Sequence, residues 1–288
     1  MSKYRPLRSA LYMPAANDRA LEKAKSLPAD AIIFDLEDAV APDAKDAARA
    51  AACAAAASGH YGRRELTIRC NGLDTPWGVA DLAAIATSTA AAVVVPKVSS
   101  VAYLDEVSSR LESAGAPESM TVWAMVETPT AIFDARAIAA HPRVSVLVMG
   151  TNDLARELRV PLVADRRALV PHLATALLAV REAGKTILDG VFNDVKDLDG
   201  FSAECAQGVE LGFDGKTLIH PGQIDIANDA WAPSATEVEQ ARRIIAAFDE
   251  AVADGRGVVT VDGRMIENLH VANAQRTLSI AEAIAALD

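Results

Sequence analysis

The sequence predicts a closed (β/α)8 barrel that carries a helical extension at its C-terminal end. Eight short apolar runs alternate with segments of helical periodicity, and the runs are rich in the aliphatic residues of buried parallel strands. They cover residues 9–13, 31–36, 66–70, 91–95, 121–126, 144–149, 186–188 and 215–219. Eight strand and helix units in series favour a closed barrel over an open doubly wound sheet.

Helices are expected in the segments between these strands. Asn17 is a suitable N-cap for the first helix, and Gly59 ends the second, which is rich in alanine. Thr75 and Pro76 supply an N-cap and a first-turn proline for the third. The other predicted helices are recognised by their apolar spacing, so that the set covers residues 20–26, 44–58, 101–111, 131–140, 166–183 and 201–211 besides the one after Pro76.

The chain continues well beyond the last predicted strand. Ser234 and the glutamate three residues later have the spacing of a capping box and start another helix. A short hairpin is expected around residues 258–261, and a final helix at 269–287. Because a barrel does not need this segment, we expect a catalytic domain at residues 1–233 and an extension at 234–288 that packs on a neighbouring subunit or covers the site as a lid.

Composition excludes several classes of protein. The 288 residues are 51% hydrophobic and carry a formal net charge of -11, with no block of Lys and Arg to bind nucleic acid. No apolar run reaches the roughly 18 residues that a membrane span needs, and the first residues lack the apolar core of a signal peptide. We therefore expect a cytoplasmic enzyme without a nucleic-acid or membrane partner.

Two carboxylates stand where neighbouring strands end. Glu127 directly follows the strand at 121–126, and Asp153 comes shortly after the strand at 144–149. Active sites of such barrels lie at the carboxyl ends of the strands, and Mg²⁺ prefers oxygen ligands with water and substrate completing its shell. Each residue alone has a structural alternative, an ion pair with a barrel Arg for Glu127 and a helix cap for Asp153. The pair predicts a Mg²⁺ site.

Other charged residues follow the remaining strand ends. Arg69 could hold a carboxylate or enolate oxygen with its planar guanidinium, or it could form a structural ion pair with Glu37 or Asp38. Lys97 and Lys216 leave a Schiff-base aldolase open, although both could instead neutralise the acidic mouth. The absence of a histidine cluster argues against zinc, and no GxSxG nucleophile motif is present.

An ordered set of motifs carries a family resemblance. The set comprises Asp35-Leu-Glu-Asp-Ala-Val40, Arg69-Cys-Asn-Gly72, Pro96-Lys97-Val98, Glu127-Thr128, Gly150-Thr-Asn-Asp153 and Ile219-His-Pro221-Gly-Gln223. In this order the motifs resemble the HpcH/HpaI aldolase and citrate lyase β-subunit family, particularly its malyl-CoA and citramalyl-CoA lyase branch. The resemblance extends from about residue 9 to the final helix.

The resemblance implies a Mg²⁺-dependent (β/α)8 barrel that assembles as a trimer or a hexamer. It implies that Glu127 and Asp153 bind Mg²⁺ and that Arg69 binds substrate and stabilises charge on the reacting oxygen. The matching motifs also imply substrate contacts for four further residues, namely Glu37, Asp38, Lys97 and Asn152.

Two departures from the family pattern concern catalysis and coenzyme A binding. In the family an acidic residue from a neighbouring subunit covers the site, and Glu267 stands in that place where Asp is common. The extra methylene shifts the carboxylate by about a bond length, and a misplacement of about 1 Å is enough to affect rates greatly. The segment Pro14-Ala-Ala-Asn17 lacks a cation that many members have, so that Arg19 or Lys23 is expected to contact the coenzyme A phosphates.

The resemblance implies a lyase that cleaves a 3-hydroxy-3-carboxyacyl-CoA, such as (S)-malyl-CoA or citramalyl-CoA, into acetyl-CoA and a 2-oxo acid. Such a reaction needs a Lewis acid at the hydroxyl and carboxylate and a cation for the enolate charge. Two alternatives stay open, a malyl-CoA thioesterase that uses the same site, and the β subunit of a citrate lyase complex acting on a carrier-protein thioester.

Overall fold

The computed structural model describes residues 5–287, which form two compact units. One unit spans Leu7–Ala230, and the other holds the segment after residue 230 together with residues 5 and 6. The domain boundary expected from the sequence, between residues 233 and 234, lies close to this division. Whether the extension packs on a neighbouring subunit stays a prediction.

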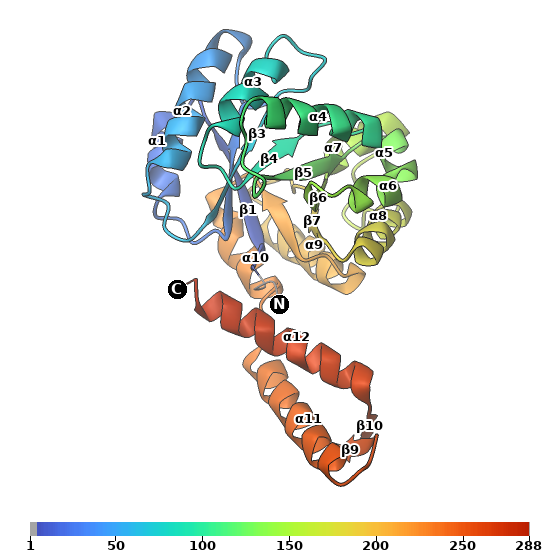
Figure 1. Ribbon diagram of the computed structural model, residues 1–288. Coiled ribbons are helices and arrows are strands. Elements are labelled where there is room, and N and C mark those ends of the chain that lie inside the picture. Colours follow the sequence, from blue (N-terminus) through green and yellow to red (C-terminus); the bar gives the residue numbers. More distant parts are fainter. Residues whose placement is uncertain (1–4, 288) are drawn as a thin grey trace. The chain divides into compact units, whose positions relative to one another are not determined.

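The first unit is a closed barrel of eight parallel strands, as predicted (Figure 1). The strands follow one another in chain order, and β1 pairs with β8 to close the sheet. Their bounds are β1 Ser9–Pro14, β2 Ala31–Asp35, β3 Glu65–Arg69, β4 Ala92–Val95, β5 Thr121–Val126, β6 Val144–Met149, β7 Thr186–Asp189 and β8 Gly215–Leu218. Because all strands run in the same direction, their carboxyl ends meet at one mouth of the barrel.

Alternate residues of the strands fill the barrel interior. Small and large side chains share this core, among them Ala10, Ile33, Val94, Trp123 and Val148. Such layers of branched and aromatic residues leave no pore through the barrel. The packed core therefore closes the barrel interior beneath its mouth.

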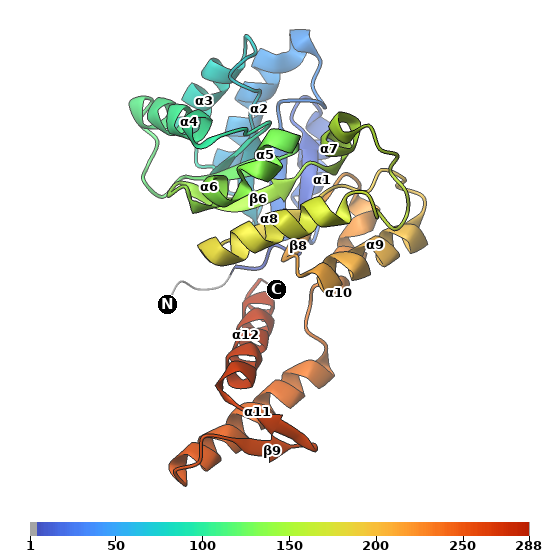
Figure 2. The same cartoon turned by 90° about the vertical axis from the view of Figure 1, so that its right-hand side faces the viewer.

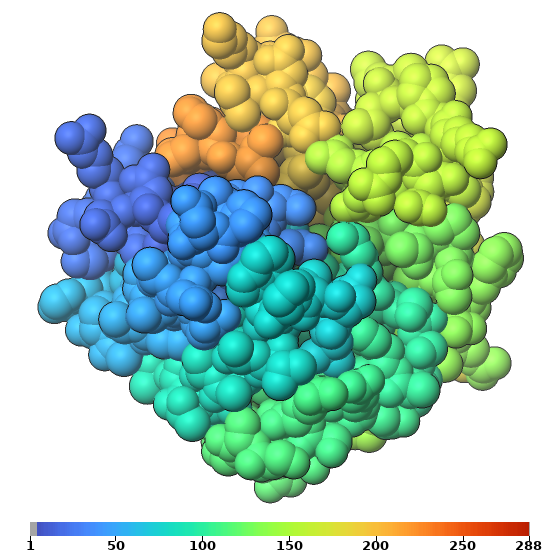
Figure 3. All heavy atoms as spheres, turned by 90° about the horizontal axis from the view of Figure 1, so that it is seen from above, coloured from blue at the N-terminus to red at the C-terminus, as the bar shows by residue number. Residues whose placement is uncertain are grey.

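Helices surround the barrel, and the segments run around it in chain order (Figures 2 and 3). They are α1 Asp18–Ala24, α2 Lys45–Ala57, α3 Gly78–Ala86, α4 Val101–Ser113, α5 Pro129–Phe133, α6 Ala135–Ala140, α7 Thr151–Leu158, α8 Val170–Ala183, α9 Leu198–Leu211 and α10 Ile224–Ala230, with short 3-10 turns at Pro42–Ala44 and Pro221–Gln223. None of the helices in residues 5–287 is both long and apolar enough to cross a membrane.

The structure corrects three of the predicted helices. The helix expected at 131–140 is divided at Asp134 into α5 and α6. The helix expected from residue 166 begins only at Val170, because Arg166 has a positive φ of 46° that an α-helix does not allow. The helix expected directly after Pro76 begins at Gly78.

The second unit contains the predicted helix, hairpin and helix. Helix α11 (Ala235–Ala253) packs along α12 (Asn268–Ala285), and β9 (Val259–Val261) pairs antiparallel with β10 (Arg264–Ile266). Ser234 and Glu237 form the predicted capping box, in which Ser234 Oγ accepts from the Glu237 N–H at 3.2 Å. Phe248, Ile266 and Val271 form a small apolar core of their own.

Candidate active site

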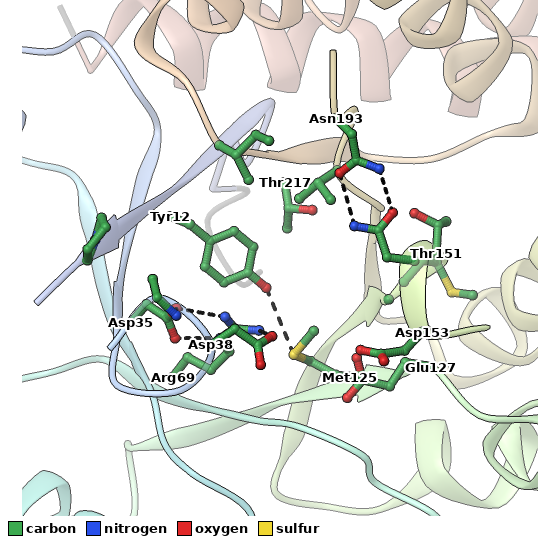
Figure 4. A pocket seen from close by; sticks show the side chains of 17 residues that line it. Tyr12, Asp35, Asp38, Arg69, Met125, Glu127, Thr151, Asp153, Asn193 and Thr217 are labelled. Atoms are coloured by element: carbon green, nitrogen blue, oxygen red, sulfur yellow. Dashed lines mark hydrogen bonds and ion pairs between the residues drawn. The ribbon is translucent and has the colours of Figure 1, made fainter. Parts of the chain in front are cut away.

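A cavity of about 380 Å³ opens at the mouth of the barrel (Figure 4). Its size is that of a small-molecule binding pocket. Residues at the carboxyl ends of seven strands line it: Tyr12, Pro14, Asp35, Asp38, Ala39, Arg69, Met125, Glu127, Met149, Gly150, Thr151, Asn152, Asp153, Val191, Asn193, Thr217 and Ile219. The structure thus brings together Arg69, Asp38, Glu127, Asn152 and Asp153, five of the residues selected from the sequence.

Glu127 is held at the cavity wall by the backbone of a neighbouring loop. Its side chain is buried, and its Oε1 accepts from the Lys97 N–H at 2.6 Å. Burial raises the pKa of Glu127 to about 7, the Lys97 N–H opposes that change, and the charges of Glu37 and Asp153 reinforce it. A Cβ on Gly150 would lie 2.4 Å from Glu127 Oε2. Any residue other than glycine at position 150 would therefore displace the Glu127 carboxylate.

Asp153 lies in the first turn of α7, directly beside the cavity. Gly150 and not Asp153 occupies the N-cap position of this helix, so the capping alternative for Asp153 is wrong. Its side chain is 25% exposed and forms an ion pair with Arg156 at 2.7 Å. Asp153 therefore presents a carboxylate next to Glu127, where the two negative charges repel.

The donor set at this wall fits Mg²⁺. Within residues 5–287 no group of three or more His, Cys, Asp and Glu side chains is arranged to hold a metal ion. Glu127 and Asp153 together offer only oxygen atoms, and a cation between them would relieve the repulsion that raises the pKa of Glu127. Two carboxylates with substrate and water oxygens form the shell that Mg²⁺ commonly takes in enzymes.

Arg69 reaches the opposite wall and is fixed there by Asp35. Its Nε and Nη2 donate to the two Asp35 oxygens at 2.6 and 2.7 Å, while its Nη1 lies 3.0 Å from Glu37 and 3.4 Å from Asp38. The Tyr12 ring stacks on the guanidinium, 4.7 Å from its Cζ. The ion pairs with Glu37 and Asp38 considered from the sequence are present, and Asp35 adds a stronger two-pronged contact.

The carboxyls around Arg69 differ in their proton affinity. Burial alone would raise the pKa of Asp35, but the charge and hydrogen bonds of Arg69 lower it below its ordinary value. Burial raises the pKa of Glu37 to about 7, opposed by Arg69 and Lys97 and reinforced by Asp38. Glu37 is therefore a group near the mouth that can exchange a proton at neutral pH.

The lysines do not favour Schiff-base chemistry. Burial acts to lower the pKa of Lys97, but Glu37 and other carboxylates raise it above its ordinary value, and the side chain is 51% exposed. Lys216 is fully buried outside the cavity, where its Nζ contacts Asp189 at 2.9 Å and Glu204 at 2.7 Å. A nucleophilic lysine needs the opposite environment, a lowered pKa and access to the substrate.

Several cavity residues escaped the sequence-based selection, Asn193, Tyr12 and Thr217 among them. Asn193 exchanges hydrogen bonds with Asn152, at 2.8 and 3.0 Å between their side-chain amides. Tyr12 and Thr217 also line the cavity. Tyr12 lies two residues before Pro14 on β1, and since alternate strand residues share a face, that spacing is a signal that could have revealed it.

Two predicted site residues, Arg19 and Glu267, are not part of the cavity lining. Arg19 is exposed on α1 and does not line the cavity, so that its contact with coenzyme A phosphates stays a prediction. Glu267 belongs to the second unit, where it precedes α12 and its backbone N–H donates to His270 Nδ1 at 3.2 Å. Its catalytic role likewise stays a prediction.

Comparisons with known proteins find relatives that match nearly the whole chain. A family model described as HpcH/HpaI aldolase/citrate lyase matches residues 8–221. The (3S)-malyl-CoA thioesterase of Cereibacter sphaeroides (strain ATCC 17023) is 52% identical over 281 residues, which cover 98% of this chain and 96% of the relative. Citrate lyase subunit beta of Escherichia coli K12 is 37% identical over 97% of this chain and 95% of its own length. A crystal structure of CitE from Mycobacterium tuberculosis with magnesium, acetoacetate and coenzyme A is 30% identical, with a TM-score of 0.78 over 95% of this chain and 97% of that one.

Proposed function

Because the chain belongs to the HpcH/HpaI aldolase/citrate lyase family, we propose that it is a Mg²⁺-dependent enzyme acting on the thioester of (3S)-malyl-CoA or a close relative. The observation that carries this proposal is the cavity in which Glu127 and Asp153 face the clamped Arg69. An anionic hydroxyacyl thioester needs both a metal and a fixed cation, since charge resides at its carboxylate and develops at its thioester oxygen.

Glu127 and Asp153 would hold Mg²⁺ at one end of this cavity. Bound there, Mg²⁺ would supply Lewis acidity to the hydroxyl and carboxylate oxygens of the substrate. The magnesium in the related CitE structure supports this assignment. The Lys97 N–H and the close approach of Gly150 orient Glu127, so that its carboxylate keeps one position as the substrate enters.

Arg69 would stabilise the negative charge on the thioester oxygen. Hydrolysis forms a tetrahedral oxyanion there, and cleavage of the neighbouring carbon bond forms an enolate. The Asp35 clamp holds the guanidinium in place before the substrate arrives, so little reorganisation is needed during the reaction. Asp38, whose side chain is 71% exposed, can move away from Nη1 when the substrate binds.

Thioester hydrolysis is our first candidate reaction. It is favoured by the relative named a (3S)-malyl-CoA thioesterase, which matches nearly the whole chain at 52% identity. Hydrolysis requires a group that takes a proton from water at neutral pH. Glu37, with its pKa raised to about 7, is the side chain beside Arg69 that meets this requirement.

Carbon–carbon cleavage, the reaction that the family resemblance put first, is the second candidate. It is favoured by the citrate lyase relative and by the family itself. Cleavage to acetyl-CoA and a 2-oxo acid would use the same Mg²⁺ and Arg69, but the proton of the substrate hydroxyl must be taken up as the carbon–carbon bond breaks and a proton delivered to the enolate carbon. We assign that proton transfer to Glu267 of a neighbouring subunit in a trimer or a hexamer.

Exposed apolar side chains of the second unit support an oligomer. Val252, Val258, Met265 and Leu269 are each between 49% and 64% exposed there. Apolar side chains gathered on so small a unit suggest a surface that another subunit covers. The cytoplasmic location expected from the sequence stays a prediction, to be tested by cell fractionation.

The deciding experiment is a product assay on the purified protein. It is incubated with (3S)-malyl-CoA or citramalyl-CoA, with Mg²⁺ or EDTA, and free coenzyme A, acetyl-CoA, malate and the 2-oxo acid are quantified. Free coenzyme A with malate establishes the thioesterase, and acetyl-CoA matched by a 2-oxo acid establishes the lyase. Activity that persists in EDTA, or appears only with a carrier-protein thioester, would overturn the proposal.

A further inference from the structure

Tyr12 places a phenol at the centre of the cavity without a strong hydrogen-bond acceptor. Its hydroxyl contacts only Met125 Sδ, at 3.9 Å, among the hydrogen bonds found for the described residues. A thioether is a weak acceptor, so this donor is left almost unused. Tyr12 is half-buried, whereas the fully buried Tyr61 has the oxygen partner that a phenol normally finds and donates to the Leu21 carbonyl at 3.0 Å.

The ring of Tyr12 directs this hydroxyl into the cavity. One face of the ring is stacked on Arg69, 4.7 Å from its Cζ, so that the side chain has little freedom to turn away. Figure 4 shows the hydroxyl pointing from β1 toward Met125, on the side where Glu127 and Asp153 lie. A substrate that reaches from these carboxylates to Arg69 must pass the phenol.

The phenol keeps its proton at neutral pH and so remains a hydrogen-bond donor. Burial raises the pKa of Tyr12 well above its ordinary value, Arg69 opposes that change, and Asp35, Glu127 and Glu37 reinforce it. The group is therefore unsuited to take a proton from water. It is suited to donate a hydrogen bond to an oxygen that gains negative charge.

We propose, on the basis of the function proposed above, that the Tyr12 hydroxyl donates a hydrogen bond to the thioester carbonyl oxygen of the substrate. Tyr12 and Arg69 then form two donors for the same oxygen, one neutral and one charged. Met125 Sδ contacts the hydroxyl at 3.9 Å and would release it to the substrate at low cost, because the bond that is exchanged is weak. Tyr12 is thereby a catalytic residue and more than a support for Arg69.

The kinetic test compares Tyr12→Phe with Tyr61→Phe. Tyr12→Phe keeps the ring on Arg69 and removes only the hydroxyl, so a purely supporting role predicts unchanged turnover. We expect its kcat to fall by about 100-fold, as for the loss of one oxyanion donor. Tyr61→Phe removes a hydroxyl that does not line the cavity, and it should leave kcat unchanged. Wild-type kcat in Tyr12→Phe would overturn the inference.

A binding test separates this inference from the proposed function. The affinities of wild type and Tyr12→Phe are measured by calorimetry for acetyl-CoA and for S-ethyl-CoA, which has a methylene in place of the carbonyl. We expect wild type to bind acetyl-CoA about tenfold more tightly and Tyr12→Phe to show a clearly smaller preference, the part that Arg69 alone provides. The same preference in both proteins would overturn the role of Tyr12, whereas failure of wild type to bind either compound would overturn the proposed function itself.

Discussion

Asp35 and Arg69 stand opposite each other on β2 and β3 and are joined by two hydrogen bonds of 2.6 and 2.7 Å. Both side chains are almost fully buried. This contact occupies the Nε and Nη2 edge of the guanidinium and leaves Nη1 toward Glu37 and the exposed Asp38. The buried carboxylate of Asp35 thus decides which edge of the Arg69 guanidinium is available to the substrate.

Replacing Arg69 by Lys tests whether the planar shape of the guanidinium matters beyond its positive charge. Lysine keeps the positive charge but cannot form the planar two-pronged contact with Asp35. We expect kcat/KM for the thioester to fall by about 100-fold, which corresponds to about 2.7 kcal/mol of transition-state stabilisation. Steady-state kinetics would measure the loss. Arg167→Lys, at a side chain that is 79% exposed, is the control and should retain wild-type kinetics.

The variants Glu127→Gln and Asp153→Asn should each abolish Mg²⁺-dependent turnover. Each keeps the size of the side chain but removes a negative charge from the metal shell. Because both residues already repel each other, we expect the folded protein to be no less stable. Thermal unfolding and activity across a Mg²⁺ titration would measure both effects, with Asp249→Asn on the exposed face of α11 as control. Full activity in either variant would contradict the metal assignment.

Gly150→Ala should impair the metal site while both carboxylates remain. The added Cβ would lie 2.3 Å from Glu127 Cβ and 2.4 Å from its Oε2, so Glu127 must shift. We expect a Mg²⁺ requirement at least tenfold higher, since the two carboxylates no longer point to one position. Gly257→Ala is the matched control, because a Cβ there meets no atom within 4 Å. An unchanged Mg²⁺ dependence would show that Glu127 is not a ligand.

Stability should depend on pH through Asp189. Burial alone would raise its pKa, but Lys216 and Arg166 lower it below the ordinary value. With the pKa lower in the folded than in the unfolded protein, the ionised form stabilises the fold above about pH 4, and this stabilisation is lost as the pH falls further. Asp189→Asn should therefore lower the free energy of unfolding by about 3 kcal/mol at pH 7.

The difference between Asp189→Asn and wild type should shrink as the pH is lowered from 5 to 3. Denaturant unfolding at several pH values would measure it. Asp165→Asn, in which an exposed ion pair with Arg167 is lost, should differ little from wild type at any pH. A constant difference across the range would mean that the cost of Asp189→Asn is steric.

Mixed oligomers should test whether Glu267 acts on a neighbouring subunit. If cleavage is observed, Glu267→Gln and Glu127→Gln should each be inactive as pure proteins. Subunits of the two variants that are unfolded and refolded together should regain part of the activity, because some sites then receive an intact Glu127 and an intact Glu267. No recovery in mixtures that do form oligomers would place Glu267 at its own subunit's site or outside catalysis.

The barrel and the residues at its mouth could be predicted from the sequence, because the patterns that predict them involve residues close together in the chain. Strand and helix periods, together with caps such as Asn17 and Ser234, predict each element from a few adjacent residues. Parallel strands then bring their carboxyl ends to one mouth, which is why Glu127, Asp153 and Arg69 were selected. The cavity contains all three.

Contacts between distant segments were decided only by the tertiary structure. Arg69 meets Asp35 because the register of β2 and β3 places them opposite each other, and sequence spacing leaves several carboxylates equally eligible. Strand phase likewise turns Thr217 into the cavity and the adjacent Lys216 away from it, since successive strand residues face opposite sides. The sequence by itself determined the architecture and the positions of Glu127 and Asp153 at the strand ends, because those follow from local periodicity. The partners of Arg69, the phenol of Tyr12 and the exclusion of Lys216 depended on register and packing, which form only when the barrel closes.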